Sequence, residues 1–254
     1  MTLRIGGAIG AGVTKTLSTA GLAFVLLFGL GQLGFLAAIN TLFEAFLASV
    51  DLPAGATEAS TSLPLALPIS TTVAGVLALV MLLAIQVVTI VLIRVMAADR
   101  QVITRESCTR RMGWVLLNSI VAGFLIGALT TVGLFLFVIP GLFLTISLLF
   151  AVVYIADEDE NFLSAIRSSW GLASGNRWRL FGLYLVVLGG FLAVSLAVGF
   201  LFPANSLASL AVSTVLNTAM IVFLMAVITD AYRQLRGDDG PGRGPEPSTD
   251  AAGA

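Results

Sequence analysis

The sequence predicts an all-α integral membrane bundle of six transmembrane helices with both chain ends in the cytoplasm. Three observations support this class: a composition too apolar for water, six long apolar segments, and basic residues sorted between the connections. Hydrophobic residues make up 58% and charged residues 11% of the 254 positions, and the mean hydropathy is +1.03. Soluble domains average about 45–50% apolar and about 25% charged residues. The composition therefore excludes an ordinary soluble enzyme.

The remaining composition excludes further classes of function. The formal net charge is −1, and no long basic run is present, which argues against binding to nucleic acid. The chain has no histidine and one cysteine, Cys108. Catalytic triads with histidine, histidine metal ligands, intrachain disulfides and Cys-rich metal sites are therefore ruled out. We expect no catalytic residue, no cofactor and no metal site.

Six apolar segments of at least about 17 residues define the spans. At 1.5 Å per residue, a segment of about 23 residues covers about 35 Å, enough for an apolar layer of about 30 Å. Lipid leaves backbone groups without partners, so helices are expected. One membrane domain, residues 1–236, contains all six. The spans are predicted at residues 17–39, 71–93, 114–137, 140–156, 180–202 and 207–229.

The connections set the predicted orientation. With six spans, all thirteen basic residues fall before the first span, in the second and fourth connections, or after the last span. The positive-inside rule assigns these four regions to the cytoplasm. The opposite side then carries the long connection 40–70 and tight turns around residues 139–141 and 203–205. The predicted location is the cell membrane, with multiple passes.

The connection between the fourth and fifth spans begins with the acidic run Asp157-Glu158-Asp159-Glu160. Carboxylates favour a helix N-terminus, so Asp159 is a candidate N-cap; a divalent cation site is the alternative. Residues 161–174 then show helical periodicity and end at Gly175-Asn176, which predicts an amphipathic helix at the membrane interface. This helix either anchors the fifth span or couples to a partner. Residues 237–254 lack periodicity and are predicted to be a disordered cytoplasmic tail.

Arginine and tryptophan residues near the span ends are the candidate contacts for lipid or partner proteins. Basic side chains at this depth bind anionic headgroups, and tryptophan favours the interface. Arg94, at the end of the second span, is expected to snorkel or to pair with Asp99. The candidate contact residues are Arg110, Arg111, Trp114, Trp170, Asn176, Arg177 and Trp178.

The spans themselves offer few chemical groups. No Asp, Glu or Lys lies deep within a span, and a polar path could be formed only by residues such as Gln86, Asn118 and Asn217. Hydrogen bonding between helices is the simpler role for these three. The GxxxG sequence at 123–127 and the small-residue pattern at 195–199 are typical of close helix packing.

Residues from about 110 to 188 resemble a family. The matching strings are Arg110-Arg111 with Trp114, residues 139–143, residues 158–160, Ala165 with Ser168-Ser169-Trp170, and Gly175-Asn176-Arg177 followed by Phe181. They resemble archaeal membrane proteins described by domains of unknown function and related to the glycerophosphodiester phosphodiesterase membrane domain and the YciC-like proteins. The resemblance implies a six-helix membrane protein. The phosphodiesterase activity belongs to members with a separate soluble domain, which we do not expect here.

Two functional hypotheses follow. The first is a non-enzymatic membrane protein that organises lipid or partner proteins at the cytoplasmic face. It depends on the scarcity of buried charge and on the cytoplasmic motifs. The alternative is a transporter or permease-like subunit, with a polar path along Gln86, Asn118 and Asn217 and a coupling helix at 161–174. Membrane lipids and a membrane or cytoplasmic protein are the expected partners.

Overall fold

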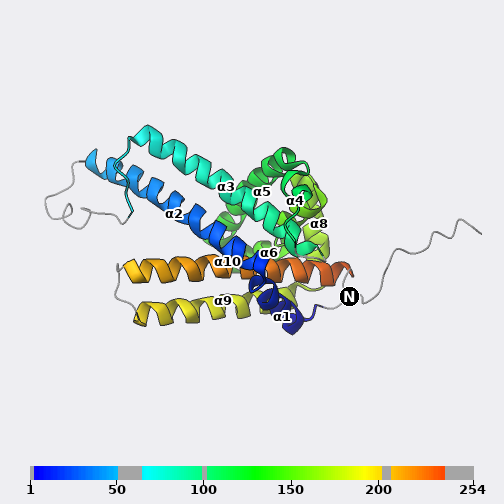
Figure 1. Cartoon of the computed structure of the whole chain (residues 1–254). Helices are drawn as coiled ribbons and strands as arrows, with labels where there is room; N and C mark the ends of the chain where they lie inside the picture. The colour runs from blue at the N-terminus through cyan, green and yellow to red at the C-terminus, as the bar shows by residue number, and fades with distance from the viewer. Residues whose placement is uncertain (1–2, 51–64, 99–101, 202–206, 238–254) are drawn as a thin grey trace, which may run out of the picture.

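The computed structural model describes residues 3–50, 65–98, 102–201 and 207–237, which form ten helices and no strand (Figure 1). Six helical segments are long and apolar enough to cross a membrane: α2, α3, α5, the α6–α7 segment, α9 and α10. The predicted all-α class with six spans is therefore confirmed. The helices are α1 (Ile5–Thr16), α2 (Thr19–Ala48), α3 (Thr71–Ala97), α4 (Arg105–Thr109), α5 (Met112–Leu136), α6 (Val138–Ser147), α7 (Ala151–Glu158), α8 (Phe162–Ala173), α9 (Arg177–Leu201) and α10 (Leu207–Arg236).

The spans are arranged as antiparallel neighbours. α2 packs along α3, α5 packs along α6, and α9 lies beside α10 (Figure 1). α10 also packs against α1, α2 and α3, which makes it a central helix. The start of α1, the end of α3, α4, α8 and the end of α10 lie together at one end of the bundle (Figure 1). We refer to this end as the charged end.

The core lies towards the charged end. In α3, every side chain from Ile90 to Met96 is buried, whereas the first half of the helix is mostly exposed. A smaller cluster joins Phe24 of α2 and Met96 of α3 to Val222 of α10. Away from this end, large apolar side chains are exposed, such as Phe124 at 82% and Phe200 at 89%. Hydrocarbon can cover these faces, so the largest packed cluster of the described residues lies where the charged segments meet.

α1 was not predicted as a separate helix. It packs across α10, where Gly12 permits the approach: a Cβ at this position would lie 2.4 Å from Cγ2 of Val227. The chain then turns, and the Ser18 side chain caps α2 by accepting from Gly21 N at 3.1 Å. A Cβ at Gly21 would lie 2.3 Å from the Lys15 carbonyl oxygen, so this turn requires a small residue. The first span therefore begins after a helical hairpin.

Several predicted boundaries need correction. α2 continues through residues 40–48, which we expected to belong to a loop, because this stretch remains apolar and helix-forming. The turn near residues 139–141 is made instead by Phe137, whose backbone is extended, and Pro140 and Gly141 lie in the first turn of α6. Proline is tolerated there because the first helical N–H groups have no partner within the helix. The predicted tail beyond Gly237 and residues 51–64 lie outside the described residues.

The fourth span is broken rather than continuous. α6 ends at Ser147, residues 148–150 form turns, and α7 begins at Ala151. The apolar run gives no sign of this break, since no glycine or proline lies within 148–151. The predicted amphipathic helix is confirmed as α8, which Asn161 caps by accepting from Ser164 N at 2.9 Å. Gly175, with φ +87°, ends it as expected.

Candidate functional site

Charged side chains gather at the charged end. Eleven of the thirteen basic residues belong to the described segments, and all of them lie on elements at this end, with six described acidic residues. At the other end, the described residues include one charged side chain, Glu44. The described charges are thus sorted along the bundle axis, with an excess of positive charge at one end.

Arg94 forms the centre of an ionic cluster. Its side chain is 4% exposed, and its Nη2 donates to Asp159 Oδ1 at 2.8 Å. Its Nε donates to the Ala156 carbonyl at 2.7 Å and its Nη1 to the Ser107 carbonyl at 3.1 Å. Asp159 also forms an ion pair with Arg110, 3.2 Å from Nε to Oδ2. One arginine thereby fastens α4 and α7 to the end of α3.

This cluster corrects the expectation for Asp159. Asp159 does not cap a helix N-terminus: it follows α7 in the left-handed conformation, φ 55°, and its carboxylate is held by two arginines. Asn161 caps α8 instead. The partner of Arg94 is this carboxylate, and Asp99 lies outside the described residues. No group of three or more carboxylate, thiol or imidazole side chains could hold a metal ion in the described ranges.

A second cluster joins α7 to α10. The Tyr232 hydroxyl donates to Glu158, and Arg236 pairs with the same carboxylate. The Arg236 guanidinium also lies over the rings of Tyr154 and Tyr232, 5.9 and 5.5 Å from the centroids. Lys15 completes the packed end, since its Nζ donates to the Met96 carbonyl at 2.9 Å and lies 3.7 Å from Asp230. These tyrosines and Lys15 were not singled out from the sequence.

Ser169 of α8 bridges the break in the fourth span. Its hydroxyl donates to the Ser147 carbonyl at 2.9 Å and accepts from Phe150 N at 3.1 Å. The carbonyl that ends α6 and the N–H that precedes α7 are therefore both satisfied by one buried side chain. A helix interrupted within a membrane requires such partners, because lipid supplies none. α8 is thus locked to the broken span.

The structure brings together two of the predicted contact residues, Trp170 and Arg177. The Arg177 guanidinium lies 5.0 Å from the Trp170 ring centroid and 4.5 Å from that of Phe143. Phe143 and Trp170 meet edge to face at 5.5 Å. The stack therefore unites α6, α8 and the first turn of α9. Arg177 Nε is buried without a hydrogen-bond partner in the described structure.

The other predicted contact residues lie around this stack and the ionic cluster. Arg111 lies over its neighbour Trp114, 5.8 Å from the ring centroid, and both side chains are exposed. Trp178 is 86% exposed and touches Phe181 at 6.3 Å between centroids. Asn176 supports the turn into α9 through its backbone, with its N–H bound to the Ala173 carbonyl at 3.1 Å. Arg110 instead belongs to the ionic cluster.

A polar hollow of about 230 Å³ opens beside the ionic cluster, between the end of α3, α4 and the end of α7. Arg94 and Arg110 line it together with Glu106 and Asp157. Charges of both signs surround the space, so it selects neither anions nor cations by net charge.

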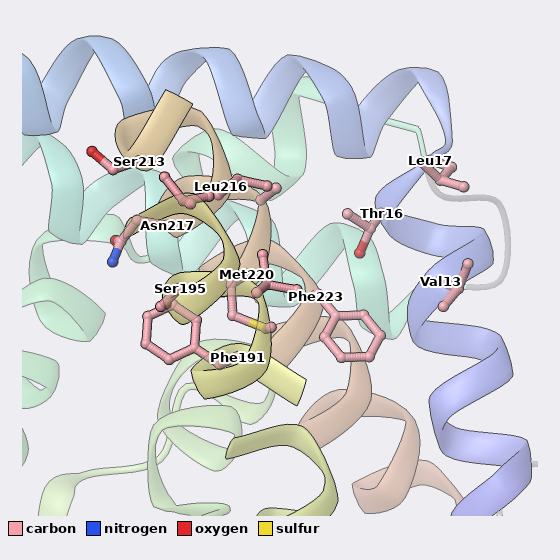
Figure 2. Close-up of a pocket in the computed structure, with 13 residues that line it drawn as sticks. Val13, Thr16, Leu17, Phe191, Ser195, Ser213, Leu216, Asn217, Met220 and Phe223 are labelled. Atoms are coloured by element: carbon pink, nitrogen blue, oxygen red, sulfur yellow. The ribbon is translucent and has the colours of Figure 1, made fainter. Parts of the chain in front are cut away.

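The three residues of the predicted polar path are placed separately. Asn118 donates to the Trp114 carbonyl at 2.8 Å and accepts from Phe162 N at 3.0 Å, so it fixes the start of α8. Gln86 lines a hollow between α2, α3 and α5. Asn217 accepts from Gln32 at 3.4 Å and lines a different hollow of about 380 Å³ between α1, α9 and α10 (Figure 2). The described structure therefore places no shared path through these residues.

The hollow in Figure 2 is mostly apolar. Phe191 of α9 and Met220 and Phe223 of α10 point into it, and Ser195, Ser213 and Asn217 gather towards one side. α1 closes the opposite side with Val13, Thr16 and Leu17. The space opens between membrane-spanning helices, and we find no catalytic arrangement of side chains in it.

Comparison with known proteins gives one family match. No curated protein and no solved structure matches the chain significantly. One family matches residues 3–235, which include every described helix except the final residue of α10. The match covers the charged end and all six spans. The chain therefore belongs to the family of the domain of unknown function DUF7847.

Proposed function

We propose that this chain is a non-enzymatic, multi-pass protein of the cell membrane that organises anionic lipid at its charged end, facing the cytoplasm. The observation that carries the proposal is a set of exposed arginines beside exposed tryptophans at the span ends. Arg111 with Trp114 and Arg167 with Trp170 are the main examples. Arginine binds phosphate well, and tryptophan prefers the headgroup region.

The internal ion pairs favour lipid as the ligand. Asp159 is engaged by Arg94 and Arg110, and Glu158 by Arg236. No ion pair or hydrogen bond is formed by the Arg111 and Arg167 side chains within the described residues. Their charge is therefore free to attract anionic headgroups. Each such arginine contributes about 1 kcal/mol of binding free energy near an anionic membrane surface.

The proposal includes the family relationship drawn from the sequence. We place DUF7847 near the glycerophosphodiester phosphodiesterase membrane domain and the YciC-like proteins, and we infer an archaeal origin from the shared strings and the arginine-rich usage. Phosphodiesterase activity is not part of the proposal, since that chemistry belongs to a separate soluble domain in the relatives. Binding of a partner protein at the same surface, in place of lipid, would be a different function from the one proposed.

Tryptophan fluorescence tests the proposal directly. All three tryptophans lie at the charged end. The protein is reconstituted into vesicles that contain traces of brominated phosphatidylglycerol or brominated phosphatidylcholine. We expect the anionic quencher to act several-fold more strongly, and added salt to reduce this preference because it screens exposed charges. Equal quenching by both lipids in the wild-type protein would contradict the proposal.

Two double variants measure how much the charge of these arginines contributes to the lipid preference. Arg111→Gln with Arg167→Gln removes two exposed charges and should lower the anionic preference towards unity. Arg111→Lys with Arg167→Lys keeps both charges and should retain most of it. If the glutamine and lysine variants quench alike, then these side chains do not recruit the lipid.

A further inference from the structure

The small-residue stripe of α5 is buried at Ser119, whereas Gly123 and Gly127 are exposed and uncovered by the chain's own described helices. Ser119, Gly123 and Gly127 recur every four residues and therefore lie on one face of the helix. The sequence predicts close packing at the glycine pair, but a Cβ at Gly123 or Gly127 would meet nothing within 4 Å. Among the described residues, no helix occupies the space that these glycines open.

The same face contains two polar groups without partners. Ser119 is 1% exposed, and its hydroxyl has no hydrogen bond in the described structure. Gln86 of α3 is half-buried and likewise makes no hydrogen bond with described residues. Both line a hollow of about 350 Å³ with Gly123 and Phe124. Unpaired amide and hydroxyl groups within hydrocarbon are costly, so this hollow favours an occupant that can form hydrogen bonds.

We propose that this face is a dimer interface, in which α5 packs in parallel against α5 of a second copy of the chain. A partner must be a membrane helix with small residues and polar groups at the depth of Gly123. A second copy inserts with the same orientation, because its basic residues obey the same rule. About a two-fold axis it presents the same stripe, together with its own Ser119 and Gln86. A lipid chain offers no hydrogen-bonding group at this depth.

The comparable stripe on α9 lacks the polar signal. Gly199 is also open, with nothing within 4 Å of its Cβ position, and Ser195 lies one turn earlier. However, Ser195 is exposed, and Asn217, in the neighbouring hollow, already accepts from Gln32. The two stripes therefore share their small residues, but among the described residues the α5 stripe alone ends at a buried hydroxyl without a hydrogen bond. This difference makes Gly199 a matched control for Gly123.

Disulfide cross-linking in native membranes tests the interface. In a Cys108→Ser background, Gly123→Cys and Gly127→Cys place a thiol on the proposed contact, and Gly199→Cys places one on the control face. We expect oxidation to give covalent dimers of the full chain for the α5 variants, several-fold more than for the α9 variant. Equal cross-linking at the two faces, or a cross-link to a different protein, would overturn the proposal.

Bulky substitutions provide the second measurement. A Cβ at Gly123 would meet no atom within 4 Å in the single chain, so the fold should tolerate Gly123→Ile. In bilayers, single-molecule photobleaching should show two subunits for the wild-type protein and for Gly199→Ile, and one subunit for Gly123→Ile. A monomeric wild-type protein, or a Gly123→Ile variant that stays dimeric, would refute the interface. If Gly123→Ile fails to fold, the cross-linking result decides alone.

Discussion

At the scale of single residues, the charged end depends on one carboxylate that serves two arginines. Asp159 is 12% exposed by its side chain and joins Arg94 to Arg110. We predict that Asp159→Ala lowers the free energy of unfolding by about 3 kcal/mol, because removing one partner leaves a buried charge uncompensated. Thermal unfolding in mild detergent, followed by tryptophan fluorescence, measures the change.

The left-handed backbone at Asp159 makes it possible to separate the effect of the lost carboxylate on stability from the effect of backbone strain. Asp159→Gly also removes the carboxylate but suits φ 55° better, so it should destabilise slightly less than Asp159→Ala. Glu106→Ala, at an exposed site on α4, should change stability little. If Asp159→Ala and Glu106→Ala have equal effects, then the ion pairs do not stabilise the end of α3.

At the scale of elements, the broken fourth span should depend on α8. We predict that Ser169→Ala lowers the free energy of unfolding by about 2–4 kcal/mol, since it leaves the Ser147 carbonyl and the Phe150 N–H unpaired in an apolar surrounding. Ser168→Ala is the matched control, because its hydroxyl bonds Glu160 near the surface. Similar melting temperatures for the two variants would contradict the bridging role.

The docking of α1 onto α10 gives a second prediction for an element. Gly12→Leu forces a side chain against Val227 and Phe223 and should cost about 1–3 kcal/mol of stability. Gly10→Leu, two residues away, meets open space and should be neutral or slightly stabilising, because leucine favours helices more than glycine does. Chemical unfolding of both variants in detergent compares them. Equal stability would mean that α1 does not pack as described.

These elements also show what the sequence could and could not predict. The spans were predictable because apolar runs of this length have few alternatives to a membrane helix. α8 was predictable from its periodicity and its glycine stop. The break in the fourth span was not, because it depends on Ser169, which lies on a different helix. α1 was missed because its glycines weaken the helical pattern, and they matter only through contact with α10.

The candidate site likewise has a part that the sequence could predict and a part that it could not. The strings that carry the family resemblance include Phe143, Trp170 and Arg177, which the fold stacks together. The Arg94–Asp159 pair joins positions 65 residues apart in the chain, and no local pattern connects them. Local strings therefore named residues that the fold brings together, whereas the partners within each cluster are set by packing.

At the scale of the whole molecule, charge sorting should determine the topology. The described basic residues lie at one end of the bundle, whereas Glu44 lies towards the other. The cost of moving charge across the apolar layer favours keeping the positive end in the cytoplasm. The end of α2 should then face outward, and the start of α1 and the end of α10 should face inward.

The native cysteine makes this topology measurable. Cys108 is exposed on α4 at the charged end. We predict that a membrane-impermeant maleimide labels it in inside-out vesicles but not in intact cells or right-side-out vesicles. A Cys108→Ser, Val50→Cys variant places the thiol just after α2 and should reverse this result, because Val50 is exposed at the opposite end. A single span, α3, separates Val50 from Cys108, so the two thiols should lie on opposite sides of the membrane. Labelling of both thiols from the same side would contradict the predicted topology.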